Sequence, residues 1–180
     1  DVPDAPADQS KGGMWARAFG SWTDGAGDLN GTAMQRASYD SNTWGLQGGV
    51  DVILTEDADS RFIGSLFGQY GQINSKATNE VLGAAAGSLD VTAYGVGMSG
   101  TWDTNSGLYL DAVGAYNWYN IDTSTHDGAN GDTNGHALIA SLEAGKRISL
   151  TDGMALTPQA QLVYQASTID GFTDGAGLDV

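Results

Sequence analysis

The chain has 180 residues, which suits a single domain, and it contains no cysteine. Its 7 lysine and arginine residues against 22 aspartate and glutamate residues give a formal net charge of −15. This balance argues against nucleic-acid binding, because phosphates require basic partners. No apolar run approaches the ~18–20 residues that a membrane-spanning helix needs, and the mean hydropathy is −0.23.

The N-terminal segment differs in composition from the rest of the chain. Residues 1–13 are proline-bearing and acidic, and we expect them to be the remnant of a linker. They do not resemble a secretory signal, so we expect a mature product or an excised piece of a longer chain. A first strand is expected at 14–22, followed by a long loop at 23–40 that is rich in turn-forming pairs.

Six more strands are expected, and each alternates apolar and polar residues. Their ranges in chain order are 41–54, 61–73, 88–102, 108–120, 136–150 and 154–164. The connections at 55–60, 103–107 and 151–153 are short, whereas those at 74–87 and 121–135 are long. The tail at 165–180 resembles another long loop, with an eighth strand expected to begin at Leu178.

The alternation is clearest at 108–120, where Leu108, Leu110 and Trp118 occupy even positions and Asp111 and Asn117 occupy odd ones. Successive side chains of a strand point to opposite faces, so one face suits lipid and the other a watery lumen. Alternating segments of about ten residues, joined by short and long connections in turn, are typical of membrane-spanning barrels. We therefore predict an all-β fold, an antiparallel up-and-down transmembrane β-barrel.

Polar strand residues fall on the face opposite the apolar ones, and we expect them to line the lumen. They are Arg17, Gln47, Asp51, Gln69, Asp111, Glu143, Arg147, Gln159 and Gln161. Lys146 is an exception, because it falls on the apolar face near a short turn, where it can snorkel to the interface.

Five large aromatic residues fall near the ends of predicted strands. They are Trp22, Trp44, Trp102, Trp118 and Tyr164. Aromatic girdles mark the two lipid interfaces of outer-membrane barrels, so we expect these residues to lie at those interfaces.

Residues suited to catalysis or metal binding do not form a recognisable site. The acidic stretch 122–134 lacks the ligand spacing and the closing glutamate of a calcium loop. His126 and His136 have no regularly spaced carboxylates near them. There is no Gly-x-Ser-x-Gly elbow, and GVGMSG at 95–100 lacks the ending of a phosphate loop. We expect no enzyme activity, no cofactor and no metal.

Two neighbouring segments carry a family resemblance. MWARAFGS at 14–21, followed by YDSNTWGLQGGVD at 39–51, resembles the opening of the autotransporter β-domain, the translocator of type V secretion in Gram-negative bacteria. LTPQAQLVY at 156–164, followed by GFTDGAG at 171–177, is also similar to the family. The resemblance covers nearly the whole chain from residue 14 onward.

The resemblance implies a twelve-stranded barrel in the bacterial outer membrane. Residues 14–180 would supply about seven to eight of its strands and lack the C-terminal ones, and the final Gly-Leu-Asp-Val lacks the terminal aromatic residue that assembly machinery reads. An N-terminal passenger would be carried to the cell surface or anchored there, with a linker helix in the pore. The implied partners are outer-membrane lipid, the barrel assembly machinery and the chain's own passenger.

The lumen residues then have two interpretations. They would keep a translocating chain or the linker helix hydrated, or they would form ordinary ion pairs that stiffen the wall. We expect Arg17→Ala to weaken the barrel or its assembly.

Two other functions remain open at this stage. One is a small outer-membrane adhesin or porin, closed by an eighth strand from the tail. The other is a soluble β-sandwich binding module whose acidic loops hold a ligand or calcium. The apolar face distinguishes the sandwich from a barrel, since it would pack against a second sheet instead of forming an outer belt.

Overall fold

The computed structural model describes residues 12–28, 36–79, 84–125, 130–151 and 153–171, and every element within them is a β-strand. The strands are β1 (Met14–Asp28), β2 (Arg36–Glu56), β3 (Ser60–Asn79), β4 (Ala84–Thr104), β5 (Leu108–Thr125), β6 (Asn130–Lys146), β7 (Ile148–Thr151), β8 (Met154–Leu156) and β9 (Gln159–Ile169). No helix long and apolar enough to cross a membrane occurs in this described part.

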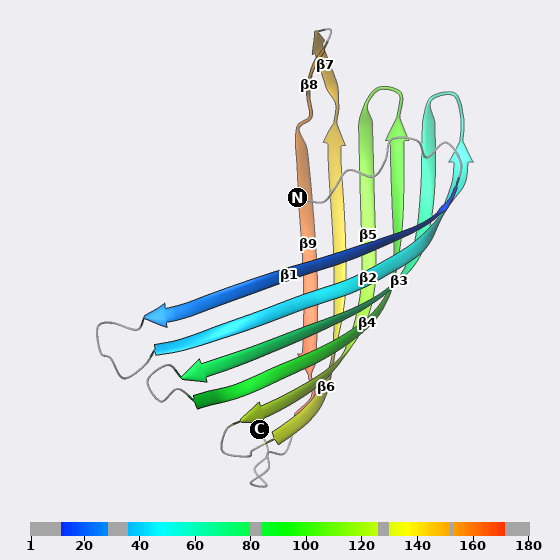
Figure 1. Cartoon of the computed structure of the whole chain (residues 1–180). Helices are drawn as coiled ribbons and strands as arrows, with labels where there is room; N and C mark the ends of the chain where they lie inside the picture. The colour runs from blue at the N-terminus through cyan, green and yellow to red at the C-terminus, as the bar shows by residue number, and fades with distance from the viewer. Residues whose placement is uncertain (1–11, 29–35, 80–83, 126–129, 152, 172–180) are drawn as a thin grey trace.

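Seven strands form one antiparallel meander in the order β1-β2-β3-β4-β5-β6-β9, and β7 and β8 pair as a separate hairpin. The large sheet is strongly curved, as Figure 1 shows. Within the described residues, β1 pairs only with β2 and β9 only with β6. The sheet is therefore not closed, which is consistent with a truncated barrel and gives no support to a small barrel closed by this chain.

The two faces of the sheet differ in burial. Odd-numbered residues lie on the concave face, where Gln47, Ile63 and Asn117 are at most 7% exposed. Even-numbered apolar residues lie on the convex face, where Leu66 is 60% and Leu162 72% exposed. Among the described residues no second sheet covers this convex face. The sandwich alternative required such a cover, so the structure contradicts it.

The strands are longer than the sequence predicts. The stretch 23–40, predicted to be loop, instead extends β1 to Asp28 and begins β2 at Arg36. The predicted loops at 74–87 and 121–135 likewise extend the ladders of β3 to β6. Glycine, asparagine and aspartate indicate turns locally, but pairing with the neighbouring strand satisfies their backbone groups, and this overrides the local preference.

The strand predicted at 136–150 is interrupted at Arg147, between β6 and β7. Pro158, between β8 and β9, lies opposite Lys146 and has no N–H to donate, and Arg147 N donates to Gly107 O at 2.8 Å instead of to the neighbouring segment. The interruption does not shift the register, because Ile148↔Leu156 continues the pairing of Gly145↔Gln159. The predicted linker, apart from Gly12 and Gly13, and the strand predicted at Leu178 lie outside the described residues.

Candidate functional site: the lumen face and the lipid belt

A chain of amide side chains crosses the concave face. Gln47 Nε2 on β2 donates to Gln69 Oε1 on β3 at 3.0 Å. Gln69 Nε2 then donates to Asn117 Oδ1 on β5, passing over β4. Gly95 lies beneath this second bond, and an added Cβ there would meet Asn117 Oδ1 and come within 2.8 Å of Gln69 Cγ. The missing side chain at Gly95 therefore makes the bridge across β4 possible.

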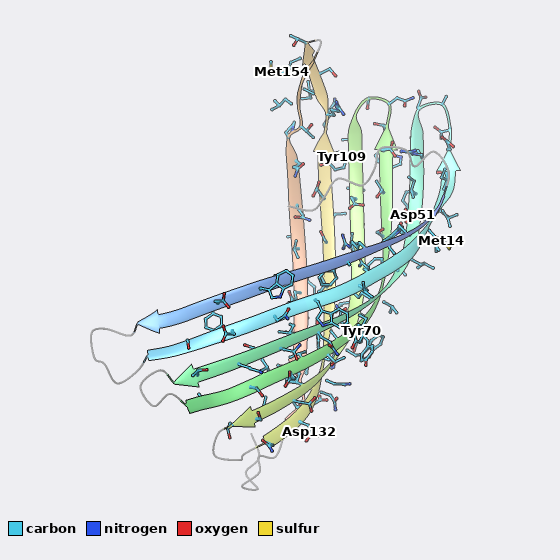
Figure 2. All side chains as sticks on the ribbon, in the orientation of Figure 1. Met14, Asp51, Tyr70, Tyr109, Asp132 and Met154 are labelled. Atoms are coloured by element: carbon cyan, nitrogen blue, oxygen red, sulfur yellow. The ribbon has the colours of Figure 1, made fainter. Side chains whose placement is uncertain are left out.

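Asp51 joins the first three strands near their short-turn end. Its Oδ1 accepts from Trp15 Nε1 of β1 at 2.9 Å and from Ser65 Oγ of β3 at 2.6 Å. Since Asp51 belongs to β2, one carboxylate connects both neighbours. Figure 2 shows Asp51 near Met14, where β1 begins.

The other two predicted lumen carboxylates also accept from neutral donors on adjacent strands. Thr101 Oγ1 donates to Asp111 Oδ1 at 2.7 Å, and Tyr109 OH donates to Glu143 Oε1 at 2.6 Å. The predicted glutamines of β9 take part as well, because Gln159 Oε1 lies 3.1 Å from Tyr109 OH and Gln161 Nε2 donates to Ser141 Oγ at 3.0 Å.

The predicted arginines behave differently. Arg17 is exposed on the edge strand β1, opposite Gln47, and Arg147 is exposed between β6 and β7. An ion pair joins Arg61 Nε on β3 to Asp103 Oδ1 on β4 at 3.3 Å, beside the short turns. The predicted carboxylates Asp51, Asp111 and Glu143 accept hydrogen bonds from neutral side chains of neighbouring strands. Near the short turns, the Arg61–Asp103 ion pair adds a charged contact between β3 and β4.

Sequence reasoning missed the donors and amides that complete these contacts. They are Trp15, Ser65, Thr101, Tyr109, Asn117 and Ser141. All have odd numbers, so alternation alone placed them on the concave face. Their pairing partners depend on strand register, which the sequence did not fix.

Aromatic rings on the concave face lie over glycines of the neighbouring strand. An added Cβ would meet the ring of Phe19 at Gly45, that of Phe67 at Gly97, and that of Tyr109 at Gly145. Trp15 and Phe67 also contact each other, with ring centroids 6.2 Å apart. This packing flattens bulky side chains against the wall, so that they take up less of the space in front of it.

The predicted interface aromatics lie on the convex face and are exposed. Their exposed fractions are 78% for Trp22, 39% for Trp44, 37% for Trp102, 47% for Trp118 and 59% for Tyr164. Tyr70 and Tyr116, absent from the predicted girdle, lie beside two of these residues on the same face. The Tyr70 ring lies 5.6 Å from that of Trp44, and the Tyr116 ring lies 4.9 Å from that of Trp118.

Neither metal ligands nor histidines assemble on these faces. Within the described ranges, no three histidine, aspartate or glutamate residues cluster in a way that could hold a metal ion. His136 instead stacks on Tyr116 at 5.8 Å, and His126 lies outside those ranges.

An open, curved meander with a polar concave face and an apolar, aromatic-rimmed convex face is thus established. A family model described as the autotransporter β-domain matches residues 14–180. The chain belongs to the autotransporter β-domain family. It is accordingly an outer-membrane translocator barrel domain of a Gram-negative bacterium, and the family implies a passenger domain in the full-length protein.

Individual autotransporters are similar over most of this chain. The adhesin BmaC autotransporter of Brucella suis is 34% identical over 148 residues, which are 81% of this chain and 4% of that protein. The pertactin autotransporter of Bordetella bronchiseptica is 30% identical over 155 residues, 84% of this chain and 16% of that protein. The chain therefore spans a small part of these full-length relatives.

Two solved structures share the fold of this β-domain. The transport unit of the autotransporter AIDA-I from Escherichia coli matches with a TM-score of 0.74 and 23% identity, over 96% of this chain and 59% of that one. The β-domain of the Bordetella autotransporter BrkA matches with a TM-score of 0.66 and 24% identity, over 94% and 63%. The chain covers about three-fifths of each solved chain.

Proposed function

We propose that this β-domain, once further strands close its sheet, lets an N-terminal passenger cross the outer membrane and then anchors or releases it at the cell surface. Further strands would satisfy the open edges of β1 and β9, because hydrocarbon does not tolerate unpaired backbone groups. We propose residues 14–180 as the part of the barrel supplied here and residues 1–13 as the linker.

The direction of β1 supports this proposal. Met14 pairs with Val50 near the short-turn end of the sheet, and the strand runs from there toward the long connections. Outer-membrane barrels turn their short connections to the periplasm. A passenger that precedes β1 therefore joins the wall on the periplasmic side and must cross the membrane to reach the surface.

The concave face supports the lumen assignment of the predicted residues. Gln47, Gln69 and Asn117 present amides to that side, while Asp51 and Asp111 add carboxylates with neutral partners. A polar wall of this kind offers hydrogen bonds to the backbone of a chain in transit without holding it by strong charge pairs. The same bonds give the carboxylates a structural role, and we propose no catalytic role for them.

The partners follow from the same geometry. We propose outer-membrane lipid against the convex face and the barrel assembly machinery at the open strand edges, where unpaired backbone groups can add a strand. We propose no nucleic-acid partner, since the charge of −15 would repel phosphates.

Cross-linking in the full-length protein tests the proposal. A passenger stalled in transit and carrying one cysteine should form a disulfide with Ser65→Cys, which faces the lumen. The matched control is Leu66→Cys, its neighbour on the convex face, which is 60% exposed there. The proposal predicts a cross-linked band for Ser65→Cys and none for Leu66→Cys.

A passenger epitope that reaches the surface of intact cells without any Ser65→Cys adduct during stalling would contradict passage through this lumen. Equal cross-linking at both positions would also contradict it, because the two side chains face opposite sides of one strand.

A further inference from the structure

The β7–β8 hairpin extends the β6–β9 pair beyond the other short turns, as Figure 1 shows. Ile148 pairs with Leu156 and Ser149 with Ala155, in the register already set by Leu142↔Leu162. The faces of the hairpin therefore continue the faces of the large sheet, although the ladder is broken at Pro158.

One face of this hairpin is apolar. Ile148, Leu150, Met154 and Leu156 are between 40% and 57% exposed and continue the convex face of the barrel. The opposite face carries Ser149 and Ala155. Figure 2 shows Met154 at the tip of the hairpin. A turn that stood free in the periplasm would gain nothing from four exposed apolar side chains on one face.

The aromatic girdle near the long connections shows how the membrane plane cuts this sheet. An outward position is a residue on the convex face, and successive outward positions are two residues apart along a strand. Trp44 pairs with Gly20 and so lies one outward position nearer the short turns than Trp22. Tyr70 pairs with Leu46, one further position along. Tyr164 pairs with Ala140, two outward positions beyond His136, the partner of Trp118. The girdle thus slants across the ladder, as expected for tilted barrel strands.

The other margin of the apolar belt must slant in parallel if the belt has constant height. On β3 and β4 it ends at Phe62 and Trp102, which pair with each other. On β5 it ends one outward position further, at Leu108, which pairs with Lys146. Continued to the next pair of strands, this line reaches Ile148 and its partner Leu156, with Leu150 and Met154 beyond them toward the tip of the hairpin. The span from Leu156 to Tyr164 then matches the ~9–11 residues that a strand needs to cross a membrane.

Basic residues lie where this extended belt begins. Lys146 and Arg147 are both exposed, and neither forms an ion pair with a described residue. The β2–β3 turn, in contrast, carries Glu56, Asp57 and Asp59. A cation beside an apolar edge suits the phosphate of a lipid headgroup, and Lys146, on the apolar face, can reach it by snorkelling.

We propose that the β7–β8 hairpin is a membrane-interface anchor, with its apolar face in the periplasmic leaflet and Lys146 on a phospholipid headgroup phosphate. The inference rests on the proposed orientation, in which the short turns face the periplasm. It assigns to this one turn a lipid-binding role that the acidic β2–β3 turn does not share.

Spin labels in the full-length protein, reconstituted in phosphatidylethanolamine–phosphatidylglycerol vesicles, test the depth of the hairpin. The β-domain residues contain no cysteine, so single labels are placed at Leu150→Cys or Met154→Cys, with Ser149→Cys as the control on the opposite face. The spin relaxation of labels at Leu150 and Met154 should be accelerated more by oxygen, which concentrates in lipid, than by a water-soluble nickel complex. The label at Ser149 should show the reverse.

A label at Leu66→Cys, in the middle of the belt, separates two kinds of failure. If Leu66 is in lipid while Leu150 and Met154 are in water, the hairpin inference is overturned and the membrane barrel stands. If Leu66 is also in water, the proposed function itself fails.

The headgroup contact has its own readout in native mass spectrometry of the detergent-extracted full-length protein. Lys146→Gln should lower the retained phosphatidylglycerol about fivefold, the change that corresponds to ~1 kcal/mol for one basic residue near anionic lipid. Lys76→Gln, on β3 toward the long connections, serves as the control and should retain the lipid. Equal retention in all three proteins would overturn the headgroup assignment.

Discussion

At the scale of single residues, the concave wall depends on where side chains are missing as much as on where they are present. Gly95 is buried beneath the bond from Gln69 to Asn117, and Asn117 itself is 3% exposed. A buried amide that loses its partner costs far more than an exposed one. The glycine therefore has a sharply defined role that local propensity, which disfavours glycine in strands, does not suggest.

Gly95→Ala should destabilise the barrel by about 1–3 kcal/mol, because its methyl group displaces Asn117 Oδ1 and leaves buried amides unpaired. The temperature at which the full-length barrel loses its heat-modifiable gel mobility should fall accordingly. Gly114→Ala is the control, since an added Cβ there has nothing within 4 Å, and its effect should stay within about 0.5 kcal/mol. The same loss in both variants would show that the amide bridge contributes nothing.

At the scale of elements, the sequence predicted which face of the sheet each strand residue occupies, but it did not predict where the strands end. Alternation correctly separated Leu46 from Gln47 and Leu110 from Asp111, because a strand has only two sides. It did not predict that β1 continues to Asp28, since Asp24-Gly25 indicates a turn locally while long-range pairing with Tyr39 and Asp40 holds the strand. Nor did it predict the Gln69–Asn117 bridge, which depends on the registers of β3, β4 and β5 together.

The short β2–β3 connection is an element whose stability should depend on pH. Asp57 Oδ1 accepts from the backbone N–H groups of Asp59 at 3.1 Å and Ser60 at 3.0 Å. These bonds favour the carboxylate and lower the pKa of Asp57 below its ordinary value of 3.8. The contribution of Asp57 to the turn is therefore fully present above pH 3.8 and is lost as the pH falls through the lowered pKa.

Hydrogen exchange of the Ser60 amide checks this dependence in the full-length protein. Its protection factor should fall as the pH decreases through the Asp57 pKa, after correction for the intrinsic exchange rate. In Asp57→Asn, which keeps an acceptor but does not titrate, the protection should not change over the same range. An identical pH profile in both proteins would assign the dependence to another group.

At the scale of the whole molecule, the remaining question is closure. The sequence predicted about seven strands and an incomplete barrel, and the sheet has seven strands with β1 and β9 at its edges. The curvature brings the polar face inward, yet the wall buries few large side chains, and Ile63 and Ala137 are its buried apolar residues in the described ranges. A sheet with so little core depends on complete backbone pairing, because in lipid each unpaired backbone group costs several kcal/mol.

Residues 1–180 alone should therefore not form a stable membrane barrel. In detergent they should migrate identically with and without boiling, and they should aggregate through the edges of β1 and β9. If further strands pair with both edges in the full-length protein, as proposed, that protein should shift on boiling. The comparison needs no proline substitution in either edge strand, because chain length is its single variable. A heat-modifiable, monomeric species from residues 1–180 would mean that β1 and β9 can pair directly, and the small closed barrel would then replace the translocator fragment as the explanation of this fold.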